Sequence, residues 1–341
     1  MKPILIDALY INMGGALTVL NRLIDGCVEA RLDFVLIKDA RCPRLRSEDG
    51  VKKLVVMKPS IWKRHKYYKQ HRNDYHSVLC MANVPPTVKM SCKVHTYFHN
   101  LSILMNQESM PVSWKMKNLL KRAIVTNYAR NTDNWVVQTS NTESLIKSKL
   151  PWKGKNFYRF PIYFIPEEFK STGTENGKDY VFVGNYTFAK GHDQLLEAWK
   201  LLHDEGINVT LHVTLWNCES FLPKVRTAVK DGVRIVNHGE VPFGELGKLY
   251  RTCKAVVYPS FNESLGLGIV EGLYAGCDII ASDLPFTHAI CIPSEVFDPH
   301  SPQTIADAIK RYEKCHSSRS QLTIHDCLSE LIELISEGYT R

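Results

Sequence analysis

The sequence predicts an α/β protein with two doubly wound, Rossmann-like domains that face a cleft. Three observations lead to this prediction. The chain has 341 residues, which at roughly 150 residues per domain suggests two domains. Short apolar runs alternate with amphipathic stretches, as in parallel strands joined by crossover helices. The alternation is interrupted once, between residues 151 and 166.

The first series of elements predicts a domain over residues 1–160. Its strand-like runs are followed by stretches with apolar residues at helical spacing, such as residues 16–30. A helix starts after residue 139, where Ser140 or Asn141 can cap it and Glu143 supports its first turn. The predicted strands cover residues 4–10, 34–38, 54–57, 77–81, 94–98 and 135–138.

The prolines of the interrupted segment predict the domain boundary. Pro151, Pro161 and Pro166 lie in a basic, aromatic segment. Proline cannot donate to a central strand ladder, and it restricts the residue before it. The first domain is therefore expected to end at residue 160.

The second series predicts a domain over residues 161–323. Residues 324–341 are expected to form a C-terminal helix, amphipathic over 324–337, that can pack back on the first domain. The predicted strands of the second domain cover residues 180–184, 209–214, 233–236, 255–259 and 279–281. Its predicted helices cover residues 194–205, 221–230, 245–252 and 302–315, with 271–275 inside a further helix.

Composition excludes several classes of protein. Hydrophobic residues make up 44% and charged residues 23% of the chain, which excludes a mostly disordered protein. No apolar run approaches the roughly 18 to 20 residues of a membrane-spanning helix, and the N-terminus lacks the features of a secretory signal. The ten cysteines form no Cys-x-x-Cys pair, so reduced thiols are expected rather than disulfides or a metal site. We expect a cytoplasmic protein.

Charge is unevenly distributed between the domains. Residues 1–160 contain 27 Lys and Arg against 11 Asp and Glu, whereas the remainder contains 16 against 24. The densest basic stretch runs from Trp62 to Arg72 and interleaves cations with aromatic residues. Such a stretch suits an anionic membrane surface at the inner face of the membrane; a solvated helix or loop without a partner is the alternative. No recognised nucleic-acid module surrounds it, so nucleic acid is not an expected partner.

The strongest motif lies between Glu263 and Glu271. It follows a buried strand and precedes a helix, at the sheet edge where open α/β folds bind ligands. Gly266 and Gly268 allow close backbone approach, and the helix start offers N–H groups to a phosphate. Glu271 can accept hydrogen bonds from a vicinal diol such as a ribose, and Glu263 faces another hydroxyl-rich group. Purely structural roles for the two carboxylates would not explain the glycine-spaced loop between them.

Two further motifs also follow predicted strands. Lys190 stands after Gly184 and just before a helix, where lysine suits diphosphate oxygens; taken alone, it would more often be a surface lysine. Gly14 and Gly15 lack the G-x-G-x-x-G spacing of a nicotinamide site. His99 is expected to titrate near neutrality and to orient a substrate or exchange a proton with it, although a lone histidine is more often structural.

Together these motifs resemble those of the GT-B glycosyltransferases of the large family called family 4, or glycosyl transferases group 1. The family has an E-x7-E signature, a glycine-to-lysine element, an N-terminal glycine loop and a first-domain histidine. In this chain they match Glu263 through Glu271, Gly184 through Lys190, Gly14-Gly15 and His99. The resemblance covers nearly the whole chain and is most specific between residues 180 and 299.

The resemblance implies a hexosyltransferase that moves a sugar, with retention, from a UDP- or GDP-linked donor to a glycan or lipid-diphosphate-linked acceptor in cell-surface polysaccharide synthesis. The first domain would bind the acceptor, and the second would bind the nucleotide sugar. No metal or cofactor is expected, and the chain has no Asp-x-Asp pair. The implied catalytic residues are His99, Glu263 and Lys190. The implied donor-binding residues are Gly15, Gly184, Asn185, Lys190, Gly266, Leu267, Gly268 and Glu271.

This chain departs from the family pattern at two places. Asn185 stands where many relatives have an arginine, which leaves the second phosphate cation unidentified. Leu265 and Gly268 replace an aromatic residue and a proline, which predicts a differently shaped donor pocket. The alternatives are a GT-B nucleotide-sugar hydrolase, epimerase or phosphorylase, and a noncatalytic subunit that binds a nucleoside diphosphate.

Overall fold

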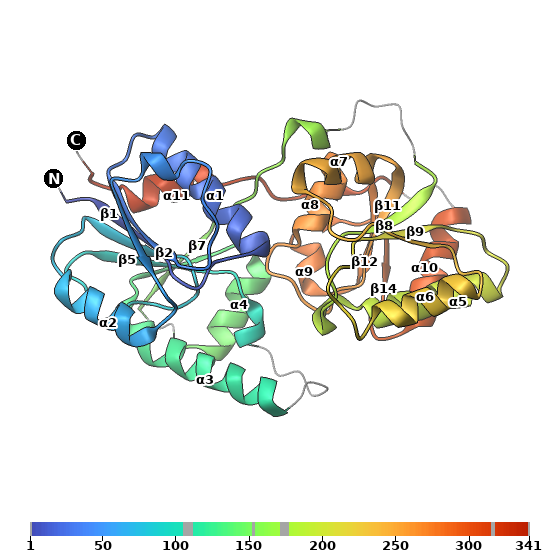
Figure 1. Ribbon diagram of the computed structural model, residues 1–341, viewed down its shortest axis with the longest axis horizontal. Helices are drawn as coiled ribbons and strands as arrows, with labels where there is room; N and C mark the ends of the chain where they lie inside the picture. The colour runs from blue at the N-terminus through green and yellow to red at the C-terminus, as the bar shows by residue number, and fades with distance from the viewer. Residues whose placement is uncertain (1, 105–111, 152–153, 171–176, 315–317, 340–341) are drawn as a thin grey trace. The chain divides into compact units, whose positions relative to one another are not determined.

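The computed structural model describes residues 2–104, 112–151, 154–170, 177–314 and 318–339. They form two compact units (Figure 1). Unit 1 comprises Met1–Phe164 and His325–Arg341, and unit 2 comprises Ile165–Ile324. The main sheet of each unit is entirely parallel, with helices packed on its faces. The predicted fold class, two Rossmann-like α/β domains, is therefore confirmed.

Unit 1 contains a seven-stranded sheet in the order β3-β2-β1-β4-β5-β6-β7. Its strands are β1 (Ile4–Ala8), β2 (Phe34–Asp39), β3 (Lys53–Met57), β4 (Ser77–Cys80), β5 (Lys93–Phe98), β6 (Asn134–Val137) and β7 (Asn156–Arg159). Its α-helices are α1 (Gly14–Glu29), α2 (Ile61–Gln70), α3 (Val112–Tyr128), α4 (Ser140–Lys149) and α11 (Leu328–Ile335). Because successive side chains of a strand point to opposite faces, Ile6 joins the core beneath α1 while Leu5 joins the core beneath α2.

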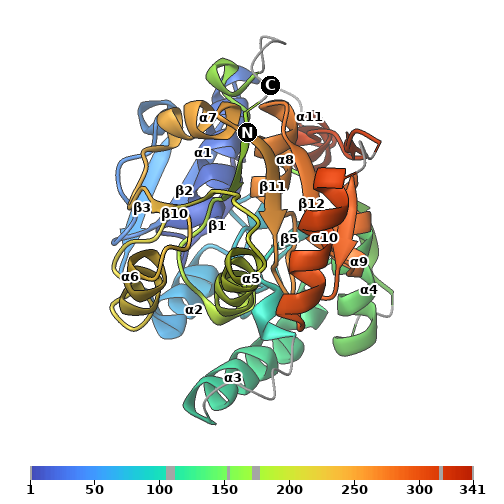
Figure 2. The ribbon, with the colours of Figure 1, turned by 90° about the vertical axis from the view of Figure 1, so that its right-hand side faces the viewer.

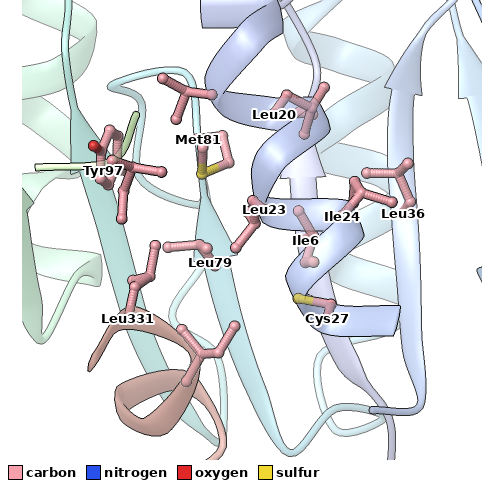
Figure 3. Close-up of a cluster of buried hydrophobic side chains, with 14 of the residues drawn as sticks. Ile6, Leu20, Leu23, Ile24, Cys27, Leu36, Leu79, Met81, Tyr97 and Leu331 are labelled. Carbon is pink, nitrogen blue, oxygen red and sulfur yellow. The ribbon is translucent and has the colours of Figure 1, made fainter. Parts of the chain in front are cut away.

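The C-terminal helix α11 is part of the core of unit 1. Leu331 of α11 is buried in the same cluster as Leu23 of α1 and Leu79 of β4 (Figure 3). The hydroxyl of Ser77 donates to the carbonyl of Ile335 at 2.5 Å. The segment after residue 324 thus completes the face of the sheet that α1 covers.

Two local features of unit 1 differ from their sequence-based expectation. The segment between Pro151 and Pro161 contains β7, which pairs with β6 and forms the edge of the sheet. The cap of α4 is Thr139, whose backbone is extended and whose hydroxyl accepts a hydrogen bond from the Thr142 amide. Ser140 is already helical, so it cannot serve as the cap.

The basic stretch from Trp62 to Arg72 is not a uniform surface. Most of it forms α2, which buries Arg64 and Tyr68 on one side. Arg64 donates to the Asp7 carboxylate at 2.6 Å, and Tyr68 donates to the same carboxylate at 2.5 Å. Two members of the predicted membrane-facing stretch are therefore internal, because they satisfy a buried carboxylate of β1. Its exposed residues include Trp62, Lys63, Lys66 and Lys69.

Unit 2 contains a six-stranded parallel sheet in the order β10-β9-β8-β11-β12-β14. Figure 2 labels three of its strands, β10, β11 and β12. The strands are β8 (Asp179–Phe182), β9 (Leu211–Val213), β10 (Ile235–Asn237), β11 (Cys253–Tyr258), β12 (Asp278–Ser282) and β14 (Glu295–Phe297). A small antiparallel pair joins β13 (Cys291–Ile292) and β15 (Gln321–Leu322). The helices are α5 (His192–Asp204), α6 (Leu222–Lys230), α7 (Phe243–Arg251), α8 (Leu267–Tyr274), α9 (Pro285–His288) and α10 (Pro302–Lys314).

Candidate functional site

Two loops of unit 2 meet at the carboxyl edge of its sheet. One follows β8 and contains Lys190, and the other follows β11 and contains Glu263. They meet because β8 and β11 are neighbours in the sheet. The Phe261 amide donates to the Ala189 carbonyl at 2.8 Å. Gly191 has a φ of +68°, and a Cβ there would lie 2.2 Å from a backbone oxygen of the other loop, so only glycine fits at this contact.

The ammonium group of Lys190 is held beside the Glu263 carboxylate. Lys190 Nζ lies 3.2 Å from Glu263 Oε1. The same oxygen accepts hydrogen bonds from the Tyr258 hydroxyl and the Ser260 hydroxyl, each at 3.0 Å. Lys190 Nζ also lies 5.9 Å from the ring centre of Phe182 and 5.7 Å from that of Tyr258. The lysine charge is therefore fixed near the sheet edge, where it can stabilise an anion.

Glu271 is buried in α8 and is held by a tyrosine of the preceding helix. The hydroxyl of Tyr250, in α7, donates to Glu271 Oε2 at 2.9 Å. Burial raises the pKa of Glu271 to about 7, although the Tyr250 hydrogen bond and the Lys190 charge act in the opposite direction. The carboxyl group therefore exchanges between its protonated and ionised forms near neutral pH, and the ionised form is an acceptor for hydroxyl groups.

The loop between the two carboxylates leads into the first turn of α8. Gly266 caps this helix with a φ of +62°. The amides of Leu267 and Gly268 belong to the first turn, whose N–H groups have no acceptor within a helix. A Cβ on Gly268 would lie 3.0 Å from the Tyr258 ring and 3.4 Å from the Tyr250 hydroxyl. Glycine at 268 thus leaves space for the two tyrosines that hold the carboxylates. The spacing of the motif alone does not reveal this reason for a glycine at 268.

The residues around Gly184 connect the β8 loop to β9. The Gly184 amide donates to the Thr214 hydroxyl at 2.9 Å, and Asn185 Oδ1 accepts from the Trp216 amide at 3.2 Å. The Gly184 carbonyl accepts from His192 Nε2 at 3.0 Å, and burial lowers the pKa of His192 to about 4. Asn185 therefore shapes the loop through backbone contacts.

The residues predicted in unit 1 also lie at a carboxyl edge. Gly14, with a φ of +66°, and Gly15 begin α1 directly after the β1 loop and are exposed. His99 follows β5, and its amide donates to Asn83 Oδ1 at 2.7 Å. The Asn100 amide donates to the same oxygen at 3.1 Å. Because β1, β4 and β5 are consecutive in the sheet, the loops after them share one edge.

The expected titration of His99 near neutral pH is wrong. Burial of the ring lowers the pKa of His99 to about 4, and an interaction with the Met81 backbone only partly opposes this shift. His99 is therefore neutral at pH 7. A neutral imidazole can donate or accept a hydrogen bond, but it does not supply a positive charge.

Several residues that shape the site carry no sequence signal of their own. Tyr258 and Tyr250 hold the two carboxylates, and Asn83 holds the His99 loop. None of these side chains lies inside a motif with a fixed spacing. Only the position of Tyr258 at the end of a predicted strand could have drawn attention to it.

Among the described residues, one group could bring three metal ligands together. It consists of His325, Cys327 and Glu330, whose ligand atoms lie within 4.8 Å of one another. This group lies in the C-terminal segment of unit 1, before and within α11. Burial raises the pKa of the Cys327 thiol to about 11, which disfavours the thiolate form that binds metals.

Comparison with known proteins shows similarity to a family and to individual glycosyltransferases. Residues 164–324 match the family described as "Glycosyl transferases group 1". The chain is 26% identical over 137 residues to the serotype-specific mannosyltransferase WbdA of Escherichia coli, covering 39% of this chain and 17% of that protein. It is 32% identical over 87 residues to the O-antigen chain mannosyltransferase RfbU of Salmonella typhimurium, covering 25% of this chain and 24% of that protein. The chain thus spans less than a quarter of the length of these relatives.

Similarity to solved structures extends over both units. The chain superimposes on Alr3699/HepE of Anabaena, solved in complex with UDP and glucose, with a TM-score of 0.67. The match covers 99% of this chain and 95% of that one, at 13% sequence identity. The two Rossmann-like units have the GT-B fold. The family match therefore lies in unit 2, and the GT-B fold extends over both units.

Proposed function

We propose that this protein is a retaining, family 4 glycosyltransferase. It transfers a hexosyl group from a UDP- or GDP-linked sugar to a glycan or lipid-diphosphate-linked glycan in cell-surface polysaccharide synthesis. The observation that carries this proposal is the convergence of Lys190, Glu263 and Glu271 at the start of α8. A fixed cation, the amides of a helix start and two carboxylates thus lie together at the carboxyl edge of one sheet.

Each part of this edge matches one part of a nucleotide sugar. Ionised Glu271 accepts hydrogen bonds from the ribose hydroxyls, and Lys190 pairs with the diphosphate. The amides of Leu267 and Gly268 bind phosphate or sugar oxygens at the helix start. Glu263 contacts the transferred sugar. In unit 1, Gly15 contributes to donor binding, and neutral His99 contributes to catalysis.

The proposed reaction breaks the bond between the anomeric carbon and the diphosphate oxygen and forms a bond from the same carbon to an acceptor oxygen. In a single displacement, retention requires attack on the face from which the diphosphate leaves, and the acceptor proton passes to that diphosphate. Negative charge therefore grows on the leaving group. Lys190 stabilises it, and because Glu263, Tyr258 and Ser260 already fix this region, little reorganisation is needed.

No protein group in this scheme requires a metal ion, because Lys190 and the α8 amides supply the positive potential at the phosphates. Transfer should therefore persist when a chelator removes divalent cations. Loss of transfer in the chelator, restored by magnesium or manganese, would contradict metal independence without affecting the donor-binding proposal.

The test begins with the donor. Thermal unfolding is measured with a panel of UDP-, GDP-, ADP- and TDP-sugars, including GDP-mannose because two relatives are named mannosyltransferases, and UDP-glucose because of the UDP and glucose in a structural relative. A ligand at 100 times its Kd stabilises the folded state by about 2.7 kcal/mol. Glu271→Gln should lose most of this stabilisation, whereas Glu197→Gln on the exposed side of α5 should retain it.

The product then separates the candidate activities. A glycosyltransferase forms a new linkage only with an acceptor, and NMR of the product shows whether the anomeric configuration is retained. Donor consumption that is independent of acceptor would indicate a hydrolase or epimerase. Nucleotide binding without any turnover would indicate a noncatalytic subunit.

A peripheral location at the inner face of the membrane is the remaining part of the proposal. Among the described residues, no helix is long and apolar enough to cross a bilayer. The support is the exposed face of α2, where Trp62 lies beside Lys63, Lys66 and Lys69. An aromatic residue surrounded by cations suits an anionic lipid surface.

A further inference from the structure

A pocket of about 420 Å³ lies at the amino edge of the sheet of unit 1. Its lining comes from residues 89–94, which lead into β5, and from residues 130, 131 and 133, which lead into β6. The two segments lie side by side because β5 and β6 are parallel neighbours. Small-molecule sites have volumes of roughly 300–1,000 Å³. This amino-edge pocket is therefore large enough for a small ligand.

The fold holds the walls of the amino-edge pocket in place. The side-chain amide of Asn131 donates to the Pro86 carbonyl at 2.8 Å. The Val94 amide donates to Asp133 Oδ2 at 2.9 Å, which joins the two walls directly. Met90 and Val94 are buried in one core cluster of unit 1. The pocket thus exists without a ligand, and binding would not have to pay for ordering its walls.

Three basic side chains line the amino-edge pocket, against one carboxylate. Lys89, Lys93 and Arg130 are exposed, and within the described ranges none of these side chains has an ion-pair partner. The carboxylate belongs to Asp133, and one of its oxygens already accepts from the Val94 amide. The positive charges around the pocket therefore exceed the negative ones, and a bound anion would relieve their mutual repulsion.

Two neighbouring groups also favour an anion in the amino-edge pocket. Lys155 Nζ donates to the Arg130 carbonyl at 3.2 Å, so another ammonium group lies beside Arg130. Burial raises the pKa of the Cys92 thiol to about 11; the charge of Asp133 raises it further, and that of Lys2 lowers it. The thiol is therefore neutral at pH 7 and adds no negative charge to the lining.

We infer that the amino-edge pocket binds a small polyanion that carries two or more phosphate groups. Lysine pairs with phosphate oxygens as a point charge, and arginine can bind two of them through its planar fork. Three cations around one pocket can be matched by two phosphate groups, whereas a singly charged anion would leave most of the positive charge without a partner. Nucleic acid fits less well, because its binding sites follow an extended backbone rather than a single pocket.

The amino-edge pocket is separate from the candidate functional site. Lys93 begins β5 and His99 follows its end. At about 3.3 Å per residue, these two positions lie about 20 Å apart along the strand. A ligand in the pocket is therefore not a substrate of the proposed sugar transfer. The inference goes beyond that proposal and does not depend on it.

The experiment measures binding to the full chain by isothermal titration calorimetry, with inorganic pyrophosphate and fructose 1,6-bisphosphate as probes. At about 0.15 M salt, exposed charges more than about 8 Å apart are largely screened, so a diffuse excess of basic residues contributes little. We expect both probes to bind, and inorganic phosphate to bind more weakly. Lys89→Gln/Lys93→Gln/Arg130→Gln should raise the Kd by about tenfold or more, because charged hydrogen bonds are lost. The single variants Lys89→Gln and Arg130→Gln should each raise it severalfold, so the test does not depend on the folding of the triple variant.

Two controls locate the binding site. Lys115→Gln/Lys117→Gln/Lys121→Gln removes three exposed lysines of α3 in the same unit and should leave the Kd unchanged. Lys190→Ala should also retain binding, although it removes the cation proposed to hold the donor diphosphate. Absence of binding at millimolar concentrations, or an equal loss in the α3 control, would overturn the inference. Binding that is lost in Lys190→Ala but kept in the pocket variants would also overturn it, because the probes would then occupy unit 2. Since no sugar is transferred in these titrations, their outcome is separate from that of the transferase proposal.

Discussion

Replacing Glu271 with glutamine should change the pH dependence of stability. Glu271 is buried in α8 and accepts a hydrogen bond from Tyr250. Burial raises the pKa of Glu271 from its ordinary value of 4.5 to about 7. Between these values the folded state binds a proton that the unfolded state has released, so the stability of the wild type falls as pH rises.

The size of the effect follows from the two pKa values. One pH unit corresponds to about 1.4 kcal/mol, so a rise from 4.5 to about 7 limits the total loss to about 3 kcal/mol. Between pH 5 and pH 8, the ionisation of this one group should lower the free energy of unfolding by about 2.5 kcal/mol. Glutamine does not ionise, and any fixed cost of its buried amide is the same at every pH. The difference between variant and wild type therefore isolates the carboxyl group.

Urea unfolding at pH 5, 6, 7 and 8 provides the measurement. Relative to the wild type, Glu271→Gln should gain about 2.5 kcal/mol from pH 5 to pH 8, with most of the change below pH 7. Glu197→Gln removes an exposed glutamate of α5 and controls for the loss of a surface carboxylate. If the difference between Glu271→Gln and the wild type stays constant over this range, Glu271 is not a buried group of raised pKa, and the reasoning fails.

Three other substitutions test the site and its support. Lys190→Ala should lower kcat/KM on the order of 100-fold, because a fixed cation at the diphosphate is lost; near-normal turnover with the donor found in the panel would remove Lys190 from the mechanism. Gly191→Ala should lower the free energy of unfolding by about 2 kcal/mol or more in urea titrations, because its Cβ would meet backbone at 2.2 Å. Gly206→Ala, also at positive φ but in open space, should cost less, and equal losses would refute the contact argument. Arg64→Met should destabilise unit 1 by about 3–5 kcal/mol, since it leaves Asp7 buried without its cation. Adding Asp7→Asn should recover part of this loss. Thermal unfolding of the wild type, Arg64→Met and the double variant measures the recovery, and a double variant no more stable than Arg64→Met would contradict the ion-pair argument.

The sequence predicted those parts of the fold that repeat with a regular period. Strands such as β2 and β11 are nearly continuous apolar runs because both faces of a parallel sheet are covered. β7 escaped prediction because its sequence, Asn-Phe-Tyr-Arg, is half polar and lies at the sheet edge. An edge strand has a neighbour on one side only, so its composition follows different rules.

The basic stretch shows why local charge is a poor guide to exposure. Arg64 has the same sequence context as Lys63 and Lys66, yet only Arg64 is buried, against the Asp7 carboxylate. That carboxylate is 57 residues away in the chain. The exposure of four apolar residues of α3, Val112, Met116, Leu119 and Leu120, could not be predicted for the converse reason. Exposed and buried apolar residues look alike in a sequence, and only the packing of Val125 reveals which side of the helix faces inward.

In the candidate site, too, the sequence predicts the residues of spaced motifs but not the contacts that depend on long-range packing. Lys190 and Glu263 could be predicted because each belongs to a spaced motif after a strand, but their contact requires β8 and β11 to be adjacent in the sheet. Strand order is decided by the packing of the whole unit, so two side chains separated by 73 positions in the sequence carry no local sign of it. Tyr258 depends further on Gly268, whose missing side chain leaves space for the ring. A larger residue at 268 would displace the Tyr258 ring and so disturb Glu263 without contacting it. Through this dependence Gly268 is part of the site, whether or not it contacts a ligand.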